Sequence, residues 1–395
     1  MAVDAPNVPA PLPAELFEPG DFVDACMKAP DAVLYFLLNI GDGDTQLIVL
    51  PQRQTPGGGR RAVVVDIGAT RKLPALIEAL AATEILPKLG DDDPYVFPLV
   101  VATHPHNDHN AGLPEFVDRF RDHIRELWEP GYYHPNAGYI EMMRALEEAE
   151  GAIQHTQPTS GTTRYIGRVR FQVLAPAIGL RNRFDSYGIN LNNASIALKV
   201  EFPASGVEWT SDKKDKREYV RLTEKRRRLL LGADSQTLSW GKVLDDFPTL
   251  ESSNFPANKA LRMARGTDPL RADVFKVPHH GSKHGVNIEL VEAIQPKWSL
   301  ISSVGGGGEY NFPHVLAQEA VREALEPVSS TGAQHKPDWE LGIQYTGARD
   351  DKQQPLGTIA LIVPPAGAIR MWRFGDRPQD EIDFAKARRY ASRGK

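Results

Sequence analysis

The stretch VATHPHNDHNAGL, residues 101–113, places three histidines and one aspartate within six positions. His104 and His106 alternate along an extended segment, so their side chains project to the same side of it. Asp108 and His109 follow after the turn and can point elsewhere. Neutral imidazole nitrogens and carboxylate oxygens are suitable ligands for Zn²⁺, Mn²⁺ or Fe²⁺. The spacing therefore predicts two adjacent cations, each held by one of these two pairs.

The composition limits which other residues can bind a metal. The chain has 395 residues, of which 41% are hydrophobic and 25% charged, as in a globular protein with a substantial core. Its single cysteine, Cys26, excludes an internal disulfide and any zinc site built from several cysteines. No apolar run is long enough to cross a bilayer, and the first residues do not form a signal peptide. We therefore expect a cytoplasmic protein without a membrane partner.

Apolar, β-branched runs alternate with segments of helical spacing along most of the chain, which predicts an α/β fold. Residues able to bind metals follow several of these apolar runs, at the point where the expected strand ends. Loops at the strand ends of a rigid sheet often carry chemistry, so these residues are candidates for one shared site. The expected strands cover residues 32–40, 45–51, 62–68, 95–104, 165–176, 192–202, 227–235, 272–282, 297–305 and 357–374, with 165–176 and 357–374 as hairpins, and the expected helices cover 71–86, 112–127 and 316–327.

The H-x-H-x-D-H pattern after an apolar strand resembles the metallo-β-lactamase fold superfamily. Six blocks narrow the resemblance to the ComEC-type competence-protein hydrolase domain, because they run in that family's order over roughly residues 32–325. The blocks are LNIGDGDTQLIVLP, AVVVDIGA, NNASIALKV, LLLGADS, VFKVPHHGS and LISSVGGGGEYNFPH. The resemblance implies an αββα sandwich, with two mixed sheets face to face, helices outside and the metals at one edge.

The resemblance also implies a division of the ligands between two divalent ions, zinc or manganese. His104 and His106 would bind the first ion, and Asp108 and His109 the second. Asp234, which ends the strand LLLGADS, would bridge the two ions.

Further residues would complete or support this site. One of His279 and His280 would complete the second metal site, and the sequence does not say which; the other would orient it or reach substrate. Asp66 ends a strand nearby and would orient a ligand imidazole. Asn192 and Asn193 stand where most members of the superfamily have a histidine, although the ComEC-type group also has asparagines there. Asparagine is the poorer ligand, so the identity of the metal and the presence of two ions stay open.

Two neighbouring cations lower the pKa of a bridging water, which predicts metal-assisted hydrolysis. The catalytic candidates are Asp108 and Asp234 at the metals and His314, in the segment NFPH, as the group that protonates the leaving oxygen. A histidine near a helix cap is the alternative reading of His314. No G-x-S-x-G motif is present, so no serine nucleophile of that kind is expected.

The ComEC-type resemblance implies that the scissile bond is a phosphodiester, with DNA or another nucleic acid or nucleotide as substrate. Residues 211–228 support this, because they carry nine Lys or Arg against four Asp or Glu in a chain of net charge −5. Arg226 and Arg227 in that segment, and Lys283 and His284 after HHGS, are the candidate phosphate contacts. A solvated surface hairpin and an ordinary loop histidine are the alternatives.

Two other functions remain open at this point. The same metal site suits a hydrolase of small esters, lactones or amides, and it also suits a metal-binding regulatory protein without catalysis. For the domain organisation we expect a loose Pro-rich leader over residues 1–30, one hydrolase domain over 31–376 with a charged insert near 205–228, and a polar tail over 377–395.

Overall fold

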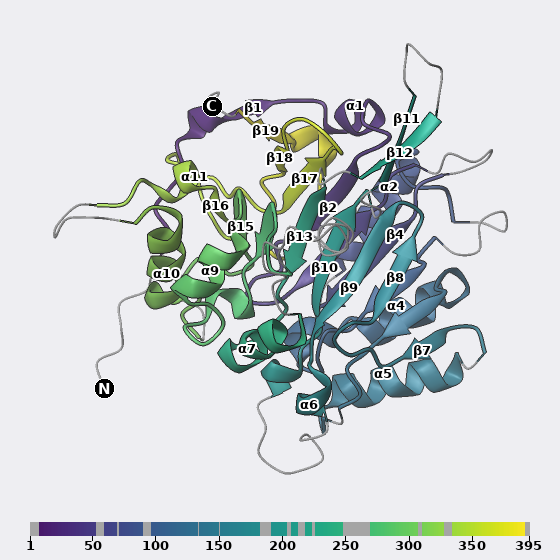
Figure 1. Cartoon of the computed structure of the whole chain (residues 1–395). Coiled ribbons are helices and arrows are strands. Elements are labelled where there is room, and N and C mark those ends of the chain that lie inside the picture. Colours follow the sequence, from purple (N-terminus) through teal and green to yellow (C-terminus); the bar gives the residue numbers. More distant parts are fainter. Residues whose placement is uncertain are drawn as a thin grey trace.

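The structure is a computed structural model of the chain (Figure 1). It describes residues 8–52, 59–68, 71–89, 96–132, 134–149, 151–181, 191–203, 207–211, 218–222, 226–247, 269–306, 310–327 and 334–391. Two mixed sheets lie face to face with helices on their outer faces, which confirms the αββα sandwich.

The first sheet has ten strands in the order β1-β19-β18-β17-β2-β3-β4-β5-β6-β7. Strands β4 to β7 run parallel to one another, and the other neighbouring pairs are antiparallel. The C-terminal ends of parallel strands lie at the same edge of a sheet, and ligands commonly bind at that edge. The strands are β1 Phe17–Pro19, β2 Val33–Leu37, β3 Thr45–Val49, β4 Ala62–Ile67, β5 Leu99–Val101, β6 Glu126–Trp128, β7 Gln154–Thr156, β17 Ile359–Val363, β18 Arg370–Arg373 and β19 Arg388–Tyr390.

The second sheet has seven strands in the order β16-β15-β14-β13-β10-β9-β8. Strands β13 to β16 are parallel, so this sheet also has an edge at which several strand C-termini meet. A separate antiparallel pair, β11 Val207–Ser211 and β12 Glu218–Leu222, lies within the charged insert. The strands of the second sheet are β8 Thr163–Ile166, β9 Val169–Ala175, β10 Ala197–Phe202, β13 Arg227–Leu231, β14 Val274–Lys276, β15 Trp298–Ile301 and β16 Ile343–Tyr345.

Strand β2 shows how the sequence builds the layers. Val33, Tyr35 and Leu37 point into the core between the two sheets, whereas Leu34 and Phe36 point into the core beneath the helices. The strand is apolar at every position because side chains alternate between two buried faces. Fully burying each large apolar side chain contributes about 1.5–3 kcal/mol.

The helices cover the outer face of each sheet (Figure 1). Side chains of α1, α2, α4 and α5 pack on the first sheet, and side chains of α7, α9 and α10 pack on the second. The helices are α1 Phe22–Met27, α2 Lys72–Ala82, α3 Asn107–Asn110, α4 Leu113–Phe120, α5 Ala137–Glu148, α6 Ile178–Arg181, α7 Thr237–Asp246, α9 Ile288–Ile294, α10 Val315–Leu325 and α11 Asp338–Leu341. Among the residues that the structure describes, none of the helices is both long and apolar enough to span a bilayer.

The ends of the chain do not follow the expected leader and tail. Strand β1, within the expected leader, pairs with β19, within the expected tail, and both belong to the first sheet. Phe17 is 6% exposed and its ring lies 5.6 Å from that of Tyr390. Strands of three residues with charged, outward-facing side chains are too short to show the alternating hydrophobic pattern from which strands are predicted. Strands β1 and β19 are therefore parts of the sandwich.

Candidate metal centre

The predicted metal ligands lie in the loops that follow three parallel strands. The segment from His104 to His109 follows β5, Asp234 follows β13, and His279 and His280 follow β14. The first of these strands belongs to one sheet and the other two belong to the second sheet. The site therefore lies where the C-terminal ends of strands from both sheets come together.

The side chains form two groups that share one carboxylate. His104, His106 and Asp234 offer ligand atoms within 4.8 Å of one another. Asp234 also lies within the same limit of a second group, which consists of Asp108, His109 and His280.

Asp234 presents one carboxylate oxygen to each group. Its Oδ1 lies 3.1 Å from Nε2 of His109 and 3.8 Å from Nε2 of His280. Its Oδ2 lies 3.6 Å from Nε2 of His104 and 3.6 Å from Nε2 of His279. This is the arrangement that a carboxylate bridging two cations requires.

The donor atoms at this site suit divalent metal ions. Nε2 of His104, His109 and His280 and Oδ1 of Asp234 are buried and make no hydrogen bond of good geometry among the described residues. Buried polar atoms normally have partners, so a convergent set without them requires an explanation. A bound divalent cation explains the set, because imidazole and carboxylate are its ligands. The side chain of Asp108 is 40% exposed, so the site is open to solvent on this side.

Hydrogen bonds at the other ring nitrogens orient the imidazoles. Nδ1 of His109 lies 2.8 Å from Oδ2 of Asp66. A carboxylate has no proton to donate, so Nδ1–H donates this hydrogen bond and Oδ2 accepts it. Thr103 donates its backbone N–H and its hydroxyl to the same carboxylate, over 2.7 and 2.8 Å. The Thr103 oxygen is then left to accept from Nδ1 of His104, 3.1 Å away. Both imidazoles therefore direct Nε2 towards Asp234.

His280 is oriented from the second sheet. Its Nδ1 lies 3.1 Å from the carbonyl oxygen of Ser302, which can only accept. Nε2 therefore faces the carboxylates of Asp108 and Asp234, at 3.4 and 3.8 Å. The Ser302 hydroxyl donates to Asp44, and Asp44 also pairs with the ammonium of Lys276. Asp44 and Lys276 are fully buried. The sequence analysis did not select these residues, because GDGD indicates only a turn and Lys276 lies inside an apolar strand.

The HHG turn has an unusual backbone. His279 and His280 have φ of 50° and 53°, in the left-handed region that side chains with a Cβ rarely occupy. Such conformations cost of order 1 kcal/mol each and persist where the surroundings impose them. Here the N–H of His279 donates to the carbonyl of Ala233 over 2.8 Å, and the carbonyl of Gly281 accepts from the N–H of His314 over 2.9 Å. The turn thereby brings both imidazoles to Asp234.

The electrostatics of the metal-free site differ between the two groups. Burial lowers the pKa of His104 well below its usual range, and the nearby His109 adds to the effect. Burial also disfavours protonation of His109, but the carboxylates of Asp234, Asp108 and Asp66 outweigh it and raise its pKa well above the usual value. Burial alone would raise the pKa of Asp234; the surrounding histidines, His109 above all, hold it well below its usual range instead. The carboxylate of Asp234 is therefore ionised, which is the form that binds cations.

The two asparagines have different surroundings. Nδ2 of Asn192 lies 3.4 Å from Nε2 of His279, so Asn192 is next to the first group. Asn193 accepts from the N–H of Ser239 over 3.3 Å and thus contacts the start of α7. Asn192 lies directly beside His279. Asn193 is linked to it through Gln236, to which it donates over 3.4 Å and whose amide nitrogen lies 3.5 Å from Nδ1 of His279.

Among the described residues, four of the five remaining candidates make no side-chain hydrogen bond or ion pair with the candidate metal ligands. Lys283 and His284 lie exposed in the turn after HHGS. Arg226 and Arg227 lie at the opposite end of β13 from Asp234. Arg226 is 6% exposed and lies near Glu201, and Arg227 donates to the carbonyl of Pro364, so their positions do not support a substrate contact. Residues 212–217 and 223–225 of the charged insert lie outside the described residues.

His314 is the N-cap residue of α10. Its Nδ1 accepts from the N–H of Leu316 over 3.1 Å, in agreement with the alternative reading of this histidine. In the neutral ring the proton is then on Nε2, so the capping role leaves a donor available. His134, which was not a candidate, lies with its ring 5.4 Å from that of His106.

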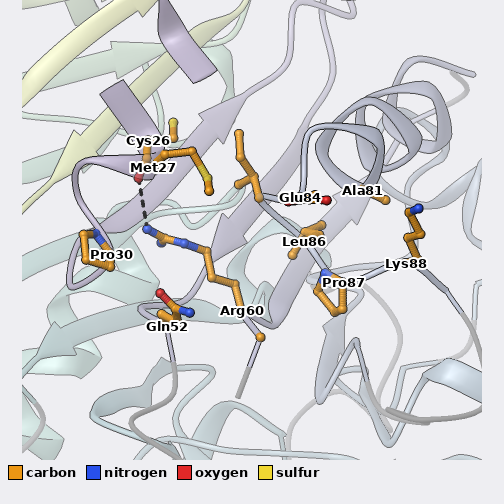
Figure 2. A pocket seen from close by; sticks show the side chains of 12 residues that line it. Cys26, Met27, Pro30, Gln52, Arg60, Ala81, Glu84, Leu86, Pro87 and Lys88 are labelled. Carbon is orange, nitrogen blue, oxygen red and sulfur yellow. Dashed lines mark hydrogen bonds between the residues drawn. The ribbon is translucent and has the colours of Figure 1, made fainter. Parts of the chain in front are cut away.

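A separate hollow of about 270 Å³ lies beside α1 and α2 (Figure 2). Arg60, which lines it, donates to the carbonyls of Ala29 and Ala32 over 2.6 and 2.8 Å. The guanidinium therefore holds the backbone between α1 and β2. Within the described part of the chain, the lining of this hollow contributes no group of metal ligands.

Comparison with known proteins gives one family and a curated relative. The sequence model of the Metallo-beta-lactamase superfamily matches residues 54–172, which include the H-x-H-x-D-H segment. The chain is 22% identical over 303 residues to ComE operon protein 3 of Bacillus subtilis (strain 168), a match that covers 74% of this chain and 31% of that protein. The chain thus spans about a third of the length of this relative.

Solved structures with a similar fold include two bacterial proteins. One is the metallo-beta-lactamase fold protein YhfI from Bacillus subtilis, with 10% identity, a TM-score of 0.34 and coverage of 81% of this chain and 97% of that one. The other is CmlA, a diiron beta-hydroxylase from Streptomyces venezuelae, with 14% identity, a TM-score of 0.33 and coverage of 80% and 52%.

Proposed function

We propose that this chain, whose resemblance to the metallo-β-lactamase superfamily is confirmed by the match over residues 54–172, is a metal-dependent hydrolase of phosphodiesters. Its substrate would be DNA or another nucleic acid or nucleotide. The observation that carries the proposal is the division of ligands into two groups that share Asp234. Paired cations suit phosphodiester cleavage, because the attacking and the leaving oxygen both carry charge.

We assign the ligands from the geometry of Asp234. His104, His106 and Oδ2 of Asp234 would hold the first ion, and Asp108, His109, His280 and Oδ1 of Asp234 would hold the second. Of the two adjacent histidines, this assignment gives His280 to the second site. His279 lies on the Oδ2 side, next to the first site.

The residues of the chain prepare the site in three ways. Bound divalent ions would supply acidification of a water and neutralisation of charge on phosphate oxygens. Asp66, Thr103 and Ser302 hold the ligand imidazoles in the tautomer that leaves Nε2 free. The exposed side of Asp108 leaves room for a phosphate to approach. His314, with its proton on Nε2, would donate it to the leaving oxygen.

The proposal is tested by assaying the Mn²⁺- and Zn²⁺-loaded protein on bis(p-nitrophenyl) phosphate and on a single-stranded oligonucleotide. We expect Asp234→Asn to lower kcat at least about a thousandfold, because both metal sites lose a ligand. Asp118→Asn is the matched control: its side chain is 59% exposed on α4, and the variant should keep full activity. Turnover of lactones or carboxylic esters without turnover of either diester would contradict the proposal.

A further inference from the structure

Two aromatic rings lead outward from the metal site. The ring of Phe312 lies 5.5 Å from that of His279 and 5.8 Å from that of His280, measured between centroids. The ring of Tyr310 stacks on Phe312 at 5.7 Å with 23° between the planes. We call Tyr310 and Phe312 the aromatic pair. The pair extends the row of imidazoles at the metal centre by two further rings.

The aromatic pair is anchored to the HHG turn. The N–H of His314 donates to the carbonyl of Gly281 over 2.9 Å, and the carbonyl of Phe312 accepts from the N–H of Gly306 over 2.9 Å. Gly281 packs so closely on Pro313 that an added Cβ would lie 2.7 Å from its ring. The segment that carries the pair is therefore fixed relative to His279 and His280. A fixed surface loses little conformational entropy when it binds a ligand.

The outer ring of the pair is exposed. Tyr310 is 64% exposed, although burial of a tyrosine ring is energetically favourable. The half-buried Phe312 lies between it and the metal ligands. An exposed ring stacked against a fixed ring next to a metal centre is suited to a flat ligand rather than to a flexible chain, because parallel planes maximise contact with a planar group.

We propose that the aromatic pair is a binding site for an unpaired nucleobase of the substrate. The inference rests on the proposed function, since a phosphodiester held at the metals places a sugar and its base next to the site. Aromatic side chains bind bases of any sequence by stacking, because every base has a π-face. A base within a duplex already stacks on its neighbours, so the site selects single strands or nucleotides over duplexes.

Binding of a phosphate monoester tests the site without any turnover. We would measure the Kd of AMP and of ribose 5-phosphate for the Mn²⁺-loaded protein by calorimetry. The wild type is expected to bind AMP about tenfold more tightly than ribose 5-phosphate. Tyr310→Ala should abolish this preference, and Tyr310→Phe should keep it, because stacking needs the ring and not the hydroxyl. Tyr165→Ala is the matched control, since Tyr165 is 60% exposed on β8 and should leave the preference unchanged.

Three results would overturn the inference: a wild type without preference for AMP, a Tyr310→Ala variant that retains it, or a Tyr310→Ala variant that weakens binding of hexyl phosphate as much as that of AMP. The last result would identify a surface for apolar chains. The outcome is separable from that of the proposed function. Diester turnover without base preference removes only the base site, whereas base preference without diester turnover removes only the phosphodiesterase.

Discussion

At the residue scale, three imidazoles of the candidate metal centre are oriented in the same way. His104, His109 and His280 each donate from Nδ1 to an oxygen, and each thereby presents Nε2 to the shared carboxylate. A carboxylate, a hydroxyl and a backbone carbonyl supply the three acceptors. Such partners fix the ring orientation and the tautomer of metal-binding histidines. These hydrogen bonds therefore account for the convergence of the three Nε2 atoms on Asp234.

The sequence predicted part of this arrangement. Asp66 was found because it ends an apolar strand near H-x-H-x-D-H, and the structure places it on His109. Asp44 and Lys276 were missed, because the two residues are 232 positions apart and their pairing is a property of the packed sheets. A buried lysine inside the run VFKV also resembles an outward-facing charge in the sequence. Local periodicity carries no information about partners from distant strands.

The Asp44–Lys276 pair gives a stability prediction. Both side chains are fully buried, so removing the ammonium leaves a carboxylate without its main counter-charge. We expect Lys276→Met to lower the free energy of unfolding by about 3 kcal/mol or more. The measurement is urea unfolding of the metal-free protein, monitored by circular dichroism.

The double variant Asp44→Asn with Lys276→Met is the control. It removes the carboxylate charge together with the ammonium, so it should recover a large part of the lost stability. A single Lys276→Met variant as stable as the wild type would show that the ion pair contributes nothing to folding.

At the element scale, the sequence-based expectations missed the helices α5, α7 and α9 and several short strands. The helix expected over 112–127 ends at Phe120 as α4, and Leu127 lies in β6 instead. Ile124, just before β6, and Leu127, within it, happen to continue the helical spacing of Phe116 and Phe120. The hydrophobic periodicity therefore did not mark the end of the helix. Longer strands with continuous apolar runs, such as β2 and β4, were located within a few residues.

The pairing of β1 with β19 gives the second stability prediction. Phe17 packs on Tyr390 and the guanidinium of Arg388 lies over its ring, 5.6 Å from the centroid. We expect Phe17→Ala to lower the free energy of unfolding by about 3 kcal/mol, the usual cost of removing a buried phenylalanine ring. Thermal and urea unfolding of the variant check this value.

Val8→Ala is the control for this prediction. Val8 also lies in the expected leader but is 64% exposed, so its variant should unfold like the wild type. Equal stability of the Phe17→Ala variant and the wild type would mean that the leader is as loose as the sequence indicated.

At the scale of the whole molecule, the candidate metal centre combines residues from both sheets of the sandwich. His104 to His109 come from the first sheet, whereas Asp234 and His280 come from the second. The inter-sheet core between them is apolar. Ions bound by both sheets would therefore stabilise the packing of one sheet on the other as well as the site itself.

Metal removal is expected to lower the melting temperature for this reason. At a free metal concentration a hundred times Kd, each ion that binds only the folded state stabilises it by about 2.7 kcal/mol. Chelation of the wild type should remove this stabilisation and leave carboxylates and imidazoles without their cations. Differential scanning calorimetry with and without EDTA measures the change. In Asp234→Asn, which loses a ligand of both sites, chelation should shift the transition much less. If EDTA leaves the wild-type transition unchanged while elemental analysis shows that the metal has gone, the ions do not hold the two sheets together.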